Sequence, residues 1–296
     1  MHPAKERSRR VNASAFTLVE LLVVIGIIAL LVSILVPALG RSRVEAQRVV
    51  CMARLRQVGN GFLMYANAHK QVMAYATVYA DRLGVGRRYY WCGNSKWIRT
   101  TESDYKLDAT LLTPYLGKNA DIHVSDCPAM IAAGAQNESP DVPSGYNPAY
   151  GGAYWLSVAD NSGNSFVKLV RIQKPTETVL LADTGALTEL GLTRWNWMME
   201  PRYNNTASYT IPRFHGRHGG RGNVLWFDGH VTSETPVYPN TNGLMGGGVG
   251  AITYNPEIYR KANLGYLAPA KTPLDDVDIN YYFFANKSGR TLTTPK

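Results

Sequence analysis

The residues best suited to chemistry are two histidines and two aspartates, His218, His230, Asp183 and Asp228, the last followed by Gly229. Calcium takes about six to eight oxygen ligands, so the two carboxylates with nearby carbonyls would suit it. Two histidines and a carboxylate would suit zinc better. We favour a third interpretation, in which a histidine bonds to an aspartate or to the backbone and thereby fixes a hairpin. The metal and the structural hypotheses both stay open on the sequence.

Three cysteines, Cys51, Cys92 and Cys127, form a second group of reactive side chains. Their spacing fits no zinc motif, and an odd number excludes a fully paired disulfide framework. A disulfide between Cys92 and Cys127 is open to the chain if this part lies outside the cytoplasm. Cys51 falls on an apolar helical stripe, where a cysteine more often serves as a small buried hydrophobe.

The net charge of +9 favours an anionic surface, either phospholipid headgroups or nucleic acid. No zinc-finger spacing and no helical run of Lys and Arg accompanies it, so no specific nucleic-acid partner is expected. A basic group near the C-terminal motif could contact phosphate, although a solvated surface is the favoured interpretation. Its members are Arg213, His215, Arg217, His218 and Arg221. Nucleophile-elbow, phosphate-loop and HExxH motifs are absent from the sequence, and we expect no enzyme.

The elements that must position these residues begin with a long apolar segment. Residues 1–15 form a short basic segment, and Phe16–Leu39 contains one ionisable side chain, Glu20. As a helix this segment reaches roughly 36 Å, enough to cross a hydrocarbon core about 30 Å thick. A secretory signal would have a shorter apolar region of about 7–15 residues. The pattern therefore predicts a transmembrane segment at 16–39 behind a leader at 1–15.

Beyond the span, an apolar seam continues at helical spacing through Cys51, Leu55, Val58, Phe62 and Tyr65. It predicts a helix over about 17–68, kinked at Pro37, whose extramembrane amphipathic part covers 40–70. We expect the seam to pack against a sheet rather than to form a groove for a partner.

The rest of the chain, 71–296, has short apolar runs and many glycines and prolines, which predict one β-rich domain. Candidate strands are 178–182 and 223–227, and Asn240–Gly250 reads as a flexible loop. An Asp-Gly pair after the second strand, before His230, predicts a hairpin. The fold class is therefore α+β, a long N-terminal helix packed on an antiparallel β-rich domain.

The junction SAFTLVELLVV resembles the prepilin family, with Ala15 before Phe16-Thr17-Leu18-Val19-Glu20 and Pro37 as the twenty-second residue from Phe16. Ala15 departs from the glycine usual in that family. The resemblance implies a pilin-like fold, cleavage between Ala15 and Phe16, and N-methylation of Phe16 by prepilin peptidase. It also implies that Glu20 neutralises the α-amine of a neighbouring subunit during filament assembly.

A second resemblance, to planctomycete and verrucomicrobial proteins with a prepilin start, covers most of the chain. Their C-terminal signature is a histidine, nine residues and Asp-Gly, which here is His218 followed by Asp228-Gly229. CMARLRQVGNGFLMYANAH, Tyr115-Leu116, Cys127-Pro128 and LLADT, which contains Asp183, are also similar. Related major pseudopilins hold calcium in a C-terminal loop, which makes calcium the one cofactor this resemblance suggests.

These observations lead to an expected function as a structural subunit of a type IV pilus or a type II secretion pseudopilus. The expected partners are prepilin peptidase, other pilin or pseudopilin subunits in a homo- or hetero-filament, and membrane lipid. The expected location is the bacterial inner membrane, with the leader in the cytoplasm and the C-terminal domain in the periplasm. The alternatives are a membrane-anchored protein that binds a ligand or a glycan, and, less favoured, an anchored hydrolase.

Overall fold

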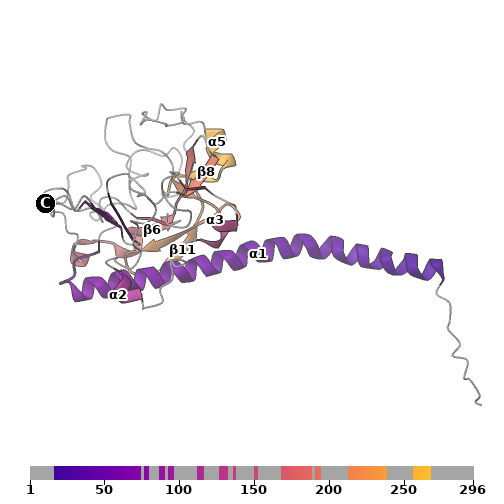
Figure 1. Cartoon of the computed structure of the whole chain (residues 1–296), viewed down its shortest axis with the longest axis horizontal. Coiled ribbons are helices and arrows are strands. Elements are labelled where there is room, and N and C mark those ends of the chain that lie inside the picture. Colours follow the sequence, from indigo (N-terminus) through magenta and orange to yellow (C-terminus); the bar gives the residue numbers. More distant parts are fainter. Residues whose placement is uncertain are drawn as a thin grey trace, which may run out of the picture. The chain divides into compact units, whose positions relative to one another are not determined.

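The chain divides into two units, Met1–Arg43 and Val44–Lys296, and one continuous helix, α1 (Leu18–Ala68), runs through the boundary (Figure 1). The computed structural model describes residues 17–74, 77–79, 87–90, 93–96, 112–116, 127–132, 136–137, 150–152, 168–188, 191–194, 213–238 and 256–267. The leader and Phe16 lie outside these ranges, as does the loop predicted at 240–250.

Helix α1 begins with a capping box. The hydroxyl of Thr17 accepts a hydrogen bond from the backbone N–H of Glu20 (3.2 Å), and the Glu20 carboxylate accepts one from the backbone N–H of Thr17 (2.9 Å). These two bonds satisfy backbone donors that the first helical turn otherwise leaves unpaired. The helix predicted over 17–68 is confirmed. Pro37 lies inside it, and the kink there stays a prediction.

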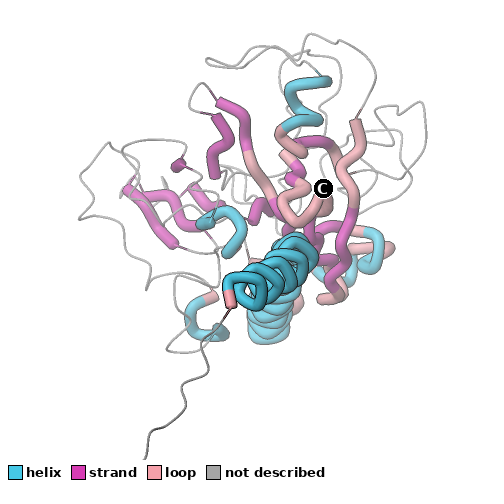
Figure 2. Tube along the Cα trace, turned by 90° about the vertical axis from the view of Figure 1, so that its right-hand side faces the viewer, coloured by secondary structure: helices cyan, strands magenta, loops and turns pink. Residues whose placement is uncertain are grey.

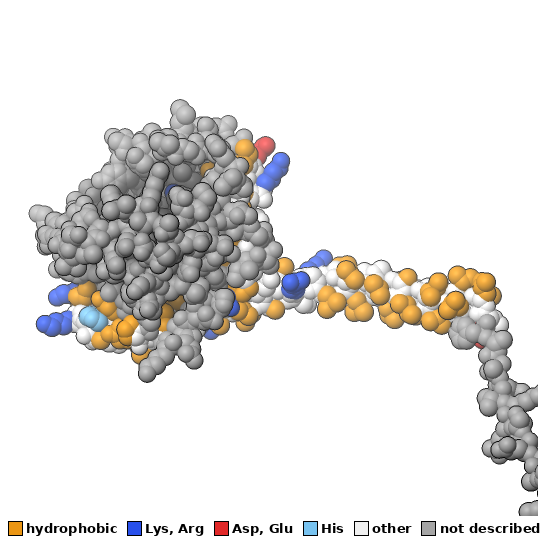
Figure 3. Space-filling model, in the orientation of Figure 1, with side chains coloured by type: hydrophobic (Ala, Val, Ile, Leu, Met, Phe, Trp, Pro, Cys, Tyr) orange, Lys and Arg blue, Asp and Glu red, His pale blue; other side chains and the backbone are white. Residues whose placement is uncertain are grey.

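The face of the first part of α1 that Figure 3 shows is covered largely by apolar side chains. Its large residues are all exposed, from Val24 at 46% to Leu18 at 73%. By length and composition the segment could cross a membrane. A helix that is apolar all round needs an apolar environment, and the described residues of the first unit, 17–43, supply none.

The second part of α1 packs into a core. Cys51, Leu55, Val58 and Phe62 are completely buried and belong to one hydrophobic cluster with strands β6 (Val179–Asp183) and β10 (Gly222–Trp226). The expectation that the seam packs against a sheet is confirmed. The contact is close because of Gly59: a Cβ at that position would lie 2.8 Å from a methyl group of Leu225.

The sheet under α1 has four antiparallel strands in the order β11-β10-β6-β5, with β11 at Val231–Glu234 and β5 at Tyr150–Gly152. All residues of β6 and β10 are buried, so both faces of these strands are covered. Both predicted strands and the hairpin are confirmed. The Asp-Gly pair forms the β10–β11 turn, where the N–H of Gly229 donates to the carbonyl of Trp226 (2.9 Å).

The remaining described elements are short (Figure 2). Strands β1, β2 and β3 form an antiparallel meander, β9 pairs with β12, and β8 lies antiparallel to β7 and parallel to β4. Their bounds are Thr77–Tyr79 (β1), Arg87–Tyr90 (β2), Gly93–Lys96 (β3), Gln136–Asn137 (β4), Ala186–Thr188 (β7), Gly191–Arg194 (β8), Phe214–His215 (β9) and Leu264–Gly265 (β12). The helices are α2 (Thr113–Leu116), α3 (Pro128–Ala132), α5 (Pro256–Lys261) and the 3₁₀ turns η5 (Leu169–Arg171) and η6 (Pro175–Glu177). The fold is α+β and pilin-like, as predicted.

The core contact between α1 and the sheet predicts a strong difference between two neighbouring helix positions. Phe62→Ala should destabilise the protein by about 3–5 kcal/mol, because it leaves a cavity in the core. Met64→Ala, whose side chain is 52% exposed, should change stability by less than about 0.5 kcal/mol. Chemical denaturation of the full chain in detergent, followed by tryptophan fluorescence, measures both. Equal effects of the two substitutions would contradict the packing described here.

Candidate functional site

The processing and assembly residues lie at the start of α1. Ala15 and Phe16 fall outside the described residues, so the proposed cleavage site stays a prediction. Glu20 is exposed, and its carboxylate also accepts a hydrogen bond from the Thr17 hydroxyl (2.7 Å). Within one chain, therefore, Glu20 has a local structural role as the acid of the capping box.

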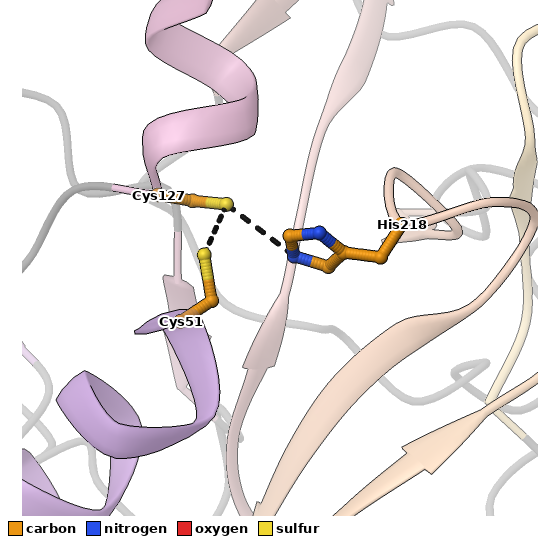
Figure 4. Close-up of side chains that lie close together, drawn as sticks. All are labelled: Cys51, Cys127 and His218. Atoms are coloured by element: carbon orange, nitrogen blue, oxygen red, sulfur yellow. Dashed lines mark hydrogen bonds between the residues drawn. The ribbon is translucent and has the colours of Figure 1, made fainter. Parts of the chain in front are cut away.

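A second cluster lies in the globular unit, where Cys51, Cys127 and His218 converge from three separate segments (Figure 4). The two sulfur atoms are 2.7 Å apart, and the Cys127 sulfur lies 3.4 Å from Nε2 of His218. Both cysteines are completely buried and His218 is 3% exposed. Three reactive side chains thus share one site, between α1 and the loops around the sheet, that is buried from solvent.

Local structure explains how His218 reaches this site. It begins a tight turn in which Gly219 and Gly220 have φ angles of 64° and 86°, and the N–H of His218 donates to the carbonyl of Arg221 (2.9 Å). Two successive positive φ angles define a type I′ turn, which glycine adopts without steric cost. The turn connects β9 to β10 and directs the imidazole toward Cys127, which lies directly before α3.

Asp183 completes the cluster from the end of β6. Its Oδ2 accepts a hydrogen bond from the backbone N–H of Asn223 (2.7 Å) and lies 3.4 Å from Nε2 of His218. Its Oδ1 lies 3.8 Å from Nε of Arg217, a side chain that is only 2% exposed. Asp183 itself is completely buried, so its charge is balanced by two buried cationic groups rather than by water.

The expected solvated basic surface is therefore wrong for part of its members. Arg217 has a buried side chain, and His215 and His218 are buried residues. The sequence shows the positive charges, but it does not show that Asp183, 30 or more positions earlier in the chain, lies beside them in the fold. Arg221 alone of these four is exposed.

When both cysteines are reduced, the electrostatics of the cluster favour the charged forms of Cys127 and His218. Burial opposes charge on Cys127, but contacts with Cys51 and His218 and the charge of Arg217 lower the pKa of this thiol to about 5. Burial likewise opposes charge on His218, but Asp183 and Cys127 raise its pKa to about 9. For His215, burial and the charge of Arg217 lower the pKa to about 3, so this ring is neutral. With both thiols reduced, the cluster holds the Cys127 thiolate beside the His218 imidazolium at neutral pH.

The other two residues of the predicted group, His230 and Asp228, lie at the opposite end of β10. The Asp228 carboxylate accepts a hydrogen bond from the backbone N–H of His230 (3.1 Å) and contacts the ring of the same residue. The His230 ring also stacks on Trp226, with centroids 5.7 Å apart. This is the arrangement expected for a histidine–aspartate pair that fixes a hairpin. The structure therefore separates the four predicted residues into two pairs and does not gather them around one ion.

The chemistry open to the buried cluster is limited. In a nucleophile–histidine–acid triad the acid bonds the ring nitrogen that the nucleophile does not use. Here Cys127 and Asp183 both approach Nε2 of His218, and the whole group is buried, which does not suit hydrolysis. Thiol and imidazole ligands do not suit calcium. Disulfide formation and binding of a thiophilic metal such as zinc are the chemistries that fit these side chains.

Comparison with known proteins gives one match. Residues 10–36 match the family model described as "Prokaryotic N-terminal methylation motif". The N-terminal region is type IV pilin-like. The match covers the junction at residues 15–20 and Pro37 follows it directly, and the apolar helix it opens indicates a membrane anchor. No curated protein and no solved structure matches the chain.

Sequence reasoning selected His218 and Asp183 but missed their connection with Cys51. It treated Cys51 as an inert core residue and paired Cys127 with Cys92, which lies outside the described residues, so that pairing is untested. A usable signal existed: Cys51 occupies the core-facing seam, and a thiol there must meet whatever the domain places against α1. The sequence did not indicate that Cys127 would be that residue.

The cluster predicts an unusual histidine titration. With both thiols reduced, we expect His218 to lose its proton near pH 9, because Asp183 and Cys127 stabilise its charged form. Since this pKa exceeds the unfolded value of 6.5, its stabilising contribution is complete below about pH 6.5 and falls as the pH rises through about 9. NMR titration of the histidine ring protons checks the value, with His218→Gln for assignment. Asp183→Asn should lower this pKa, and a His218 pKa near 6.5 in the reduced wild-type protein would contradict the cluster.

Proposed function

We propose that this protein is a structural subunit of a type IV pilus or a type II secretion pseudopilus, cleaved after Ala15 and N-methylated at Phe16. The observation that carries the proposal is the methylation motif at residues 10–36, which runs directly into α1. That helix is exposed and apolar in its first part and forms the core of a globular unit in its second. A filament subunit needs both properties in one helix.

The exposed apolar surface of α1 suits two apolar surroundings, one after the other. Lipid covers it while the subunit is in the membrane, and neighbouring helices of the same kind cover it in a filament. Transfer between two apolar surroundings has little hydrophobic cost, so the same residues serve both states. A plain membrane anchor would need only the first environment.

Glu20 supplies the specific element in this proposal. A carboxylate in hydrocarbon costs roughly 2.5 kcal/mol or more, and less near the interface, so it gains from a cationic partner. Cleavage before Phe16 would create a new α-amine about one helical turn away from Glu20. Pairing of Glu20 with the amine of a neighbouring subunit would set the register between helices, because opposite charges attract strongly at low dielectric.

Placement of the globular unit outside the cytoplasm follows from the same proposal. The basic leader would stay on the cytoplasmic side of the inner membrane, where prepilin peptidase removes it, and the residues beyond α1's apolar part would face the periplasm. Partners are then prepilin peptidase, other pilin or pseudopilin subunits, and lipid.

Membership of the His-X9-Asp-Gly family is part of the proposal, and the structure offers a physical reason for its spacing. His218 starts the turn before β10, and Asp228 and Gly229 form the turn after it. The nine intervening residues are therefore one buried strand and the ends of its two turns. The signature would preserve the length of β10 and thereby the two histidine–aspartate pairs at its ends.

Processing is the first test. Coexpression with prepilin peptidase should yield a chain that starts at N-methylated Phe16, whereas the chain without peptidase should start at Met1. Intact mass and N-terminal sequencing distinguish the two. A start near Gly40, or no change with peptidase, would mean a secreted protein or a plain anchor and would overturn the proposal.

Assembly is tested by separating the charge of Glu20 from its capping role. Glu20→Gln retains a residue that can complete the capping box with Thr17, but it removes the negative charge. We expect this variant to be inserted and cleaved normally, yet to reduce filament recovery at least about tenfold, the loss of roughly 1.4 kcal/mol per contact. Sheared-filament yield, normalised to cleaved subunit, measures it.

Glu20→Ala serves as the comparison, because it removes the charge and the cap together. If Glu20→Gln assembles normally and Glu20→Ala does not, the carboxylate acts only within its own helix. If both assemble normally, pairing with a neighbouring amine is wrong.

A further inference from the structure

We propose that Cys51 and Cys127 form a disulfide that links helix α1 covalently to the rest of the globular unit. The proposal starts from their geometry. Their sulfur atoms lie 2.7 Å apart, closer to an S–S bond of about 2.05 Å than to the roughly 3.8 Å between two thiolates on one tetrahedral zinc ion. Both side chains are completely buried and point toward each other (Figure 4).

Their surroundings favour this bond over a metal. A histidine that ligates zinc usually donates a hydrogen bond from its other ring nitrogen, which fixes the ring. Nε2 of His218 faces Cys127, whereas its Nδ1 is buried without a hydrogen-bond partner among the described residues. Nε2 is also shared with the Asp183 carboxylate, 3.4 Å away. His218 is therefore held as the partner of an acid, which does not require an ion.

The neighbouring charges indicate which sulfur reacts first. The thiolate is the nucleophile in disulfide exchange, and the Cys127 thiol has a pKa lowered to about 5 by Cys51, His218 and Arg217 against the effect of burial. The Cys127 thiolate would attack one sulfur of an oxidant disulfide and release the first oxidant thiol. Cys51 would then attack the Cys127 sulfur of the mixed disulfide and release the second. The oxidant, a protein or glutathione disulfide, gains two electrons and the two protons that the cysteines lose.

Burial indicates when this happens. An oxidant cannot reach completely buried sulfur atoms, so exchange must precede the final packing of α1 on the sheet or occur in a transiently opened form. His218 and Arg217 must already lie beside Cys127 at that stage if they are to favour its thiolate. Oxidising conditions outside the cytoplasm, which belong to the function proposed above, would then fix the bond during folding. The link closes a loop between positions 76 residues apart.

Peptide mapping tests the pairing directly. Trypsin should release Cys51 in peptide 49–54, Cys127 in 119–168 and Cys92 in 89–96. Full-length protein in detergent, digested without reductant, should contain 49–54 joined to 119–168 and free 89–96. Before digestion, the denatured chain should bind one maleimide label, and three after reduction. A link between 89–96 and 119–168 would overturn the proposal.

Two variants separate the disulfide from a metal site. His218→Gln removes a ligand that zinc would need but no atom of the bond, so the 49–54 to 119–168 link should persist. Cys92→Ser should leave the link unchanged. The opposite result would be three reactive thiols and about one bound zinc per chain, with the zinc lost in His218→Gln. That result would show that the cluster is a metal site and that the proposal is wrong.

Stability gives a further readout. Cys51→Ser should lower the Tm of the non-reduced protein by roughly 10 °C. Reduction should lower the Tm of the unmodified chain but not that of Cys51→Ser. An unchanged Tm on reduction would count against the link.

A separate arm keeps this inference distinct from the proposed function. Reduced, purified full chain is refolded with glutathione disulfide, and its link is compared with that of protein taken from cells. If the link forms only in the refolded sample and not in protein taken from cells, the pairing is supported and the periplasmic placement is contradicted. A link formed in neither sample contradicts the pairing itself.

Discussion

The contact between the second part of α1 and the buried strands β6 and β10 is the interaction on which the rest of the structure depends. It removes Leu55, Val58 and Phe62 from water and places Gly59 directly against Leu225. Each completely buried large side chain contributes about 1.5–3 kcal/mol. Without this contact the seam side chains Leu55, Val58 and Phe62 would lose the strands that they pack against.

The same contact explains why charges are buried beside it. Asp183 ends the central strand β6 on the face that meets α1, so its carboxylate cannot reach water. A single buried charge would destabilise the fold by several kcal/mol. His218, Arg217 and the N–H of Asn223 offset that cost, and the glycine turn after His218 holds the imidazole in place. The cluster is thus a consequence of ending a buried strand with an acid.

Periodicity made the architecture readable from the sequence, because the seam from Cys51 to Phe62 and the Asp-Gly hairpin depend on local spacing alone. The contact of Asp228 with His230 is local too, and it is one of the histidine–aspartate contacts that the sequence left open. The cluster around Asp183 was not anticipated, since it joins α1, the residue before α3, β6 and the β9–β10 turn, whose separations along the chain no periodicity encodes. The predicted solvation of Arg217 was wrong for the same reason: a basic run is solvated unless the fold brings a distant carboxylate to it.

A covalent link at Cys51 would hold the second part of α1 in the globular unit while the first part changes its surroundings. The first unit ends at Arg43, and Cys51 lies about two helical turns beyond it, at the first completely buried position of the seam. In the chain-entropy picture, closing a loop of this size stabilises the folded state by about 4–5 kcal/mol, comparable to losing or keeping Phe62. On the function proposed above, moving the subunit from the membrane into a filament would apply force to the chain along α1, and without the link non-covalent packing alone would have to resist that force. Linking the seam at its membrane-proximal end would keep the globular unit folded on the helix while the apolar segment exchanges lipid for neighbouring subunits.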